Sequence, residues 1–173
     1  MNDDSPAETE PRTPEDAIFI HARSEIPLDA ESNPSRLLPI VVGARIEAEC
    51  WDRPLGDRIA RHVRAIRRAN DLARDEGLHP FVITDLWYLN EPALMLQPTI
   101  TIGEPGVNAA SAHWASRVPS AFVVDGSHQV LMDLEGPHRA ACMWGVDFAK
   151  TEAATDHFEL RYLEAWLMSV AAI

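Results

Sequence analysis

The spacing of apolar residues changes along the chain between two patterns, one typical of strands and one typical of helices. Short runs rich in β-branched and aromatic residues predict buried strands. The four runs that fit the centre of a sheet are 37–42, 81–86, 99–102 and 140–144. Apolar and acidic residues alternate over 46–50, which predicts that the first strand continues past Gly43 with one solvated face. The apolar run 80–89 is a strand candidate over its whole length, with Asp85 inside it.

Helical spacing of apolar residues appears in three further segments. Each has a start signal, such as a capping side chain or an early proline, and the first also has a glycine as its stop signal. The three predicted helices run from Asp52 to a stop at Gly77, over 107–118, and from Thr151 to about Val170. Strands and helices therefore follow one another along most of the chain.

One hairpin interrupts this alternation. Asp125-Gly126-Ser127 is a turn sequence that joins the apolar runs 121–125 and 128–134. The order of elements predicts an α/β fold, a single three-layer domain with a mixed, largely parallel central sheet plus one antiparallel hairpin. We expect this domain to cover residues 17–173, beginning with a short edge strand at 17–20.

Charge and composition narrow the function classes. The chain has 173 residues, is 46% hydrophobic and carries a net charge of −12. Residues 1–16 combine many acids with three prolines, so we expect a flexible acidic tail. The acidity argues against nucleic acid and anionic membranes as partners. The first residues lack the basic and apolar regions of a signal peptide, and two cysteines make no disulfide framework, so a cytoplasmic location is expected.

A strand, a glycine loop and a helix start follow one another at 99–111. Gly103, Glu104, Gly106 and Asn108 are the candidate ligand-binding residues, because backbone N–H groups at such a loop can hold a phosphate or carboxylate. Glu104 places a negative charge in the loop, and the glycine spacing matches no established phosphate-binding motif. The alternative interpretation is a tight turn in which Asn108 caps the helix.

Two carboxylates stand at the ends of predicted strands. Asp85 and Asp147 are the candidate catalytic residues, since paired carboxylates at one sheet edge can perform acid–base chemistry. The alternative is that both are turn or cap residues. None of the seven histidines has a metal-binding spacing, so we expect neither a metal nor a cofactor.

Two kinds of side chain indicate possible partners. The basic residues between 53 and 74 form either a solvated helix face or a docking face for an acidic partner. The C-terminal helix is apolar on most of its circumference. We predict that a stripe of Phe158, Tyr162 and Trp166 contacts a second copy or a partner protein, because one sheet face can cover only part of such a helix.

Three segments of the C-terminal half carry a family resemblance. The sequences at 102–108, 144–147 and 151–154 resemble α/β modules in which a Gly-Gly-Pro-x-x-Asn loop precedes a glycine-ended strand and a Thr-x-x-Ala helix start, as in archaeal surface-layer proteins. Glu104 stands where the second glycine of that loop would be. The resemblance implies an α/β module with a structural or interaction role, and it assigns no catalytic residue.

Two functions follow as hypotheses. The first is a non-catalytic protein-interaction or assembly module, which fits the incomplete catalytic sets and the apolar C-terminal helix. The second is a small enzyme or sensor that binds a nucleotide or sugar-phosphate at the 103–108 loop. In that case Asn108 would orient the ligand, and Asp85 or Asp147 would act as base or nucleophile.

Overall fold

The computed structural model describes residues 37–70, 78–124, 126–134 and 138–171. All of them belong to one compact unit, 33–173. The predicted tail at 1–16 and the predicted edge strand at 17–20 lie outside the described residues.

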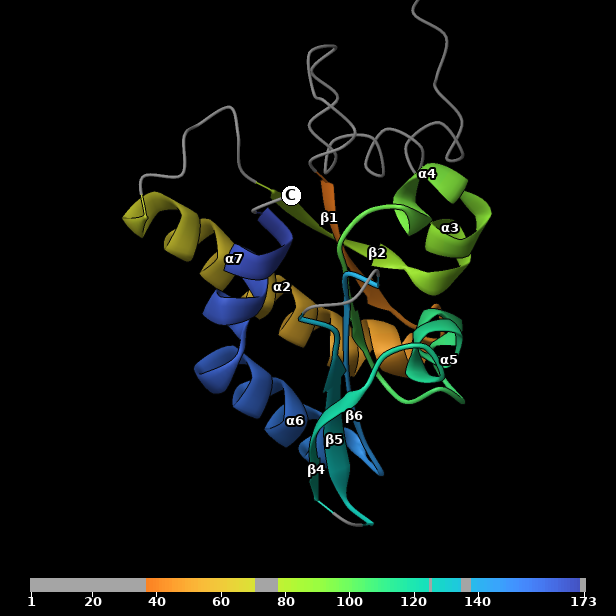
Figure 1. The fold of residues 1–173 in the computed structure, drawn as a ribbon. Helices are drawn as coiled ribbons and strands as arrows, with labels where there is room; N and C mark the ends of the chain where they lie inside the picture. Colours follow the sequence, from red (N-terminus) through yellow and green to blue (C-terminus); the bar gives the residue numbers. More distant parts are fainter. Residues whose placement is uncertain (1–36, 71–77, 125, 135–137, 172–173) are drawn as a thin grey trace, which may run out of the picture. The chain divides into compact units, whose positions relative to one another are not determined.

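A six-stranded mixed sheet forms the centre of this unit, in the order β2-β1-β3-β6-β5-β4 (Figure 1). Strands β2, β1, β3 and β6 are parallel, whereas β5 is antiparallel to both β6 and β4. The strands are β1 Leu37–Val42, β2 His79–Thr84, β3 Thr99–Ile102, β4 Ser120–Val124, β5 His128–Met132 and β6 Ala140–Gly145. The predicted α/β fold with a largely parallel sheet and one antiparallel hairpin is confirmed.

Helices cover both faces of the sheet and make the three layers. One face packs against the long helices, and its core includes Ile40, Ile100, Met143, Phe158 and Trp166. The other face packs against the short helices. The long helices are α2 Ile46–Ala69, α6 Phe148–Arg161 and α7 Leu163–Ala171, and the short ones are α3 Asp85–Asn90, α4 Pro92–Met95 and α5 Ala109–Ala115. Successive strand residues point to opposite faces, so Ile40 and Val41 belong to different cores.

The segment 46–50 is helical, and the prediction that it extends the first strand is wrong. Helix α2 begins at Ile46, with Pro54 inside it. The alternation of apolar and acidic residues over so few positions fits both periods. In the helix, Ala48 and Asp52 lie one turn apart on the buried side, whereas Ile46 is 79% exposed.

Three further boundaries differ from the predictions. Strand β2 stops at Thr84, whose hydroxyl oxygen accepts a hydrogen bond from Trp87 N and so caps α3. The C-terminal helix is divided at Tyr162, whose φ of −126° lies outside the helical range. The predicted helix at 107–118 is shortened to α5: it starts at Ala109 because Asn108 caps it, and it ends at Ala115.

The strand order sets where a site can form. From β1 the chain continues to β2 on one side, and it later returns to place β3 on the other side of β1. Open α/β sheets bind ligands at such a switch, outside the carboxyl ends of the strands. Here β1, β3 and β6 reach that edge at Val42, Ile102 and Gly145.

Candidate functional site

The loop after β3 is a tight turn in which several backbone N–H groups already have partners within the chain. Val107 N and Asn108 N both donate to Glu104 O at 2.9 Å. Asn108 Oδ1 accepts from Ala110 N at 3.0 Å and from Ser111 N at 3.3 Å. The first N–H groups of α5 therefore have partners within the chain, and the geometry matches the capped turn rather than a phosphate cradle.

Asn108 also joins two strands to this turn. Its side chain is fully buried, and its Nδ2 donates to Val41 O and Ile102 O, both at 2.9 Å. An amide is suited to this place because it donates to strand carbonyls and accepts from helix N–H groups at once. Asn108 thus holds β1, β3 and α5 together.

Asp85 is engaged in the same way. Its carboxylate is 4% exposed and accepts from Ala44 N at 3.0 Å, Leu86 N at 2.8 Å and Ala109 N at 2.8 Å. Three backbone donors occupy a carboxylate that bridges the ends of β1 and β2 to α5. Asp85 faces neither cavity described below, so the structure supports its interpretation as a turn and cap residue.

Asp147 and Gly106 lie at the surface. Asp147 caps α6 by accepting from Lys150 N at 2.8 Å, and it stands on the rim of a cavity. Gly106 is exposed, and the nearest atom to a side chain placed there would be a Glu104 oxygen at 3.7 Å. Gly106 lines neither cavity, so nothing in the geometry gives it a cradling role.

A cavity of about 170 Å³ opens between α2, the loop after β3 and the start of α6. Asp52 is the buried carboxylate in its wall, at 8% exposure. The lining residues are Glu47, Ala48, Trp51, Asp52, Gly103, Glu104, Val107, Gly145, Val146, Asp147, Phe148 and Thr151. Of the residues that the sequence analysis singled out, the structure brings Gly103, Glu104 and Asp147 together here.

Gly103 is required where the loop passes over Asp52. Its φ is +105°, which L side chains rarely adopt, and a Cβ there would lie 2.7 Å from Asp52 Oδ2. The loop after β3 therefore covers one side of the Asp52 carboxylate. Among the described residues, no side chain or backbone group hydrogen-bonds to that carboxylate.

The environment of Asp52 makes its proton affinity unusual. Burial raises the pKa of Asp52 from 3.8 to about 6, and the negative charge of Glu104 adds to this effect. A carboxyl group that titrates in this range can donate or accept a proton under ordinary conditions. Asp52 is the chemically distinctive residue of the cavity.

Sequence reasoning missed Asp52 because it took this residue as the start of a helix. The pattern that could have revealed it is the spacing of Asp52 to Leu55 and Ile59, which places a carboxylate on the apolar face of α2. An acidic residue in an apolar stripe must find a partner or face a cavity.

The charges around the cavity select against anions. Four carboxylates line it, those of Glu47, Asp52, Glu104 and Asp147, and none of the described lining residues is basic. Within the described ranges, no three His, Cys, Asp or Glu residues are grouped so as to hold a metal ion. The cavity therefore favours a ligand with hydrogen-bond donors or a positive charge over a nucleotide or sugar-phosphate.

A second cavity of about 320 Å³ lies beside the first and shares Glu104, Gly145 and Val146 with it. It is bounded by the β4–β5 hairpin. Ser127 Oγ and His128 Nδ1 are hydrogen-bonded there at 2.9 Å. The pair lies at a hairpin turn, without the strand-to-helix elbow that presents a nucleophilic serine.

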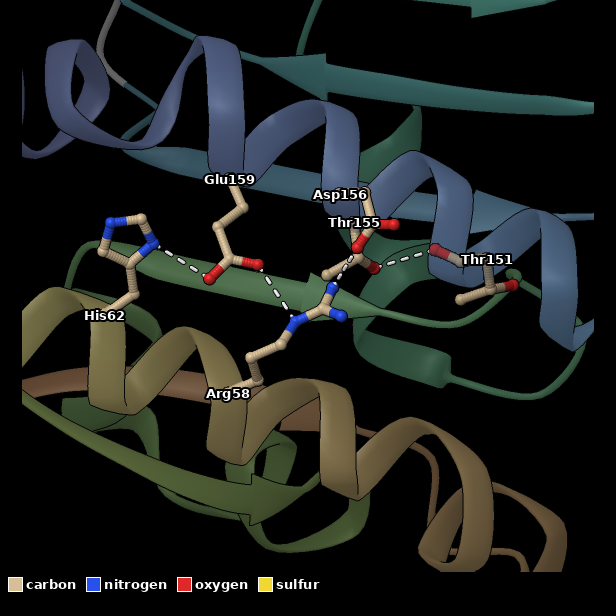
Figure 2. A network of polar contacts seen from close by, with 6 residues as sticks. All are labelled: Arg58, His62, Thr151, Thr155, Asp156 and Glu159. Carbon is tan, nitrogen blue, oxygen red and sulfur yellow. Dashed lines mark hydrogen bonds and ion pairs between the residues drawn. The ribbon is translucent and has the colours of Figure 1, made fainter.

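Ion pairs join α2 and α6, the two helices whose first turns line the cavity that contains Asp52 (the acidic cavity). Figure 2 shows Arg58 and His62 of α2 reaching toward Asp156 and Glu159 of α6. Glu159 accepts both, with its Oε2 3.0 Å from Arg58 Nε and its Oε1 2.9 Å from His62 Nδ1, and Arg58 also pairs with Asp156. Arg58 of the arginine-rich segment is thus used within the domain.

Of the three side chains predicted for a protein interface, two lie in the core and the third is partly buried against it. Phe158 and Trp166 are both fully buried and contact each other edge to face, with ring centroids 6.2 Å apart. Tyr162 packs against the same core. The break at Tyr162 lets α6 and α7 turn these side chains inward, so the fold itself accounts for the aromatic stripe. Leu160 and Met168 remain exposed, at 80% and 47%.

No family model matches the chain, and comparison with curated proteins and with solved structures gives no significant match. In the part of the chain that the structure describes, no helix is both long and apolar enough to cross a membrane.

Proposed function

We propose that this chain is a ligand-binding α/β domain whose site is the acidic cavity between α2, the loop after β3 and the start of α6. In this role it acts as a small enzyme or sensor, and Asp52 exchanges a proton with the bound molecule or forms a charge-assisted hydrogen bond to it. The ligand is small and carries no phosphate.

One observation carries this proposal. Asp52 is 8% exposed as a residue, its side chain borders a cavity, and no described residue hydrogen-bonds to its carboxylate. A buried carboxylate without partners destabilises the folded chain, and such groups concentrate at functional sites. A structural role would have supplied the donors that Asp85 has in the same sheet edge.

The test is a thermal-shift screen with and without the Asp52 carboxylate. The panel contains small ammonium compounds, neutral polyols and amides, and phosphates. We expect at least one compound outside the phosphate class to raise the Tm of the wild type by about 2 °C or more, and not that of Asp52→Asn. Asp57→Asn is the matched control, since Asp57 is an exposed aspartate of the same helix.

Two results would count against the proposal. Stabilisation by phosphates alone would restore the nucleotide hypothesis and contradict the charge argument. If no compound at millimolar concentration distinguishes the wild type from Asp52→Asn, the cavity is not a binding site.

A second candidate function is a protein-interaction module acting through the C-terminal helices. The exposed Leu160 and Met168 favour it, since both are large apolar side chains, on α6 and α7. Light scattering at micromolar concentration tests it. Self-association that Leu160→Glu abolishes would support it, and a monomer that binds no partner would not.

A further inference from the structure

Two aromatic rings stand at the mouth of the acidic cavity. Trp51 of α2 is 54% exposed and Phe148 of α6 is 37% exposed, and their ring centroids lie 5.2 Å apart. Both side chains line the cavity. They contact each other across two helices while parts of both rings stay open to solvent.

The aromatic rings and the carboxylates are complementary to the same kind of group. A ring face carries partial negative charge and attracts a cation placed over it within about 6 Å of its centroid. Asp52 and Glu104 supply full negative charges in the same cavity. A phosphate would be repelled by the carboxylates, and a hydrated metal ion gains nothing from exposed tryptophan and phenylalanine.

We infer that the ligand of this cavity is a small alkylammonium cation, held between the rings of Trp51 and Phe148 and the carboxylates of Asp52 and Glu104. This inference rests on the proposed ligand-binding function and specifies its ligand class. The volume of about 170 Å³ is below the roughly 300 Å³ at which pockets for drug-sized molecules begin, so only a compact cation fits.

The buried position of Asp52 strengthens the argument. An ammonium group that reaches Asp52 meets a carboxylate that has no competing donor among the described residues, on a side chain that is 8% exposed and so partly shielded from water. Such desolvated, charge-assisted contacts are stronger than those at an open surface. Glu47 and Asp147 on the rim add to the attraction of a cation.

The probes are choline, ethanolamine and the neutral carbon isostere of choline, in which a tert-butyl group replaces the trimethylammonium group. Each is titrated into the full chain by calorimetry near neutral pH. The isostere has the shape of choline without its charge, so it separates charge recognition from simple filling of an apolar space.

Two pairs of variants locate the binding. Trp51→Leu removes the aromatic wall, and Trp87→Leu is its control, because Trp87 is a similarly exposed tryptophan of α3 outside both cavities. Asp52→Asn and Asp57→Asn form the second pair. Trp51 and Asp52 both border the cavity. Neither substitution enlarges a side chain, and the Tm of each variant checks that it still folds.

We expect choline or ethanolamine to bind the wild type, Trp87→Leu and Asp57→Asn alike. Binding should weaken about fivefold or more in Trp51→Leu and about tenfold in Asp52→Asn, and the isostere should bind about tenfold more weakly than choline. If the isostere binds as tightly as choline, or if neither cation binds, the ammonium assignment is overturned. In that case the proposed ligand-binding function still holds if a neutral compound stabilises the wild type and not Asp52→Asn. If no compound does so, the proposed function fails as well.

Discussion

Individual carboxylates at one sheet edge have opposite roles, and their surroundings decide which. Asp85, at the start of α3, accepts three backbone hydrogen bonds. Asp52, in α2, accepts none from the described residues and faces a cavity. Both are buried. The number of donors that the fold supplies separates a structural carboxylate from one left free for a ligand.

The pKa of Asp52 predicts how stability changes with pH. A carboxyl group whose pKa is raised on folding stabilises the folded chain while it is protonated, and this contribution is lost as pH rises from about 3.8 to about 6. Asp52→Asn lacks that loss. Its free energy of unfolding should equal the wild-type value near pH 3 and exceed it by about 3 kcal/mol above pH 7.

Urea unfolding at several pH values measures this difference, with Asp57→Asn as the control. The exposed Asp57 should give a difference near zero throughout. A difference for Asp52→Asn that does not vary with pH would show that its carboxyl group titrates normally.

Asn108 is the residue on which the turn after β3 depends most. Asn108→Ala removes four hydrogen bonds and leaves buried strand carbonyls and helix N–H groups without partners. We expect a loss of about 3 kcal/mol of unfolding free energy, measured in urea. Asn90→Ala, which removes one exposed side-chain hydrogen bond, should cost less than about 1 kcal/mol, and equal losses would contradict the assigned role.

At the scale of elements, the junction between β6 and α6 is built on a glycine. A Cβ at Gly145 would lie 2.3 Å from Lys150 Cβ and 2.4 Å from the Lys150 carbonyl carbon, so the backbone would have to move. Gly145→Ala should therefore lower the unfolding free energy by about 3 kcal/mol. Gly106→Ala meets only a side-chain oxygen at 3.7 Å and should change it by less than about 0.5 kcal/mol. Similar values for the two variants would refute this account of the junction.

The contact between α2 and α6 depends on Glu159. Because Glu159 pairs with both Arg58 and His62, Glu159→Gln should cost about 1 kcal/mol in dilute buffer, and less at about 1 M NaCl, where screening weakens ion pairs. Glu152→Gln, on the same helix and without an ion pair among the described residues, is the control. A cost for Glu159→Gln that salt leaves unchanged would indicate packing rather than charge.

Element boundaries were predictable where the apolar residues followed only one spacing, either that of a strand or that of a helix. The β-branched run at 99–102 and the hairpin at 125–127 allow one interpretation, and the structure has the strand as predicted and the hairpin within a residue or two of its predicted ends. The segment 46–50 is too short to separate the two periods. The break at Tyr162 has no local sequence signal.

At the scale of the whole domain, the sequence predicted the sheet edge but not the residue that matters there. Gly103, Glu104 and Asp147 were identified as strand-end residues, and they do meet at one cavity. Asp52 comes from the second turn of a helix, and the loop after β3 passes close over its carboxylate. That contact joins residues 51 positions apart, and no local pattern encodes it.

The most direct test of the central claim is an NMR titration of the Asp52 side-chain carboxyl carbon, with and without choline. Glu47, Glu104 and Asp147 face the same cavity and are followed in the same spectra. The account predicts a midpoint for Asp52 at about 6, falling when choline is added because a bound cation stabilises the carboxylate. A midpoint near the ordinary 3.8, unmoved by choline, would contradict it.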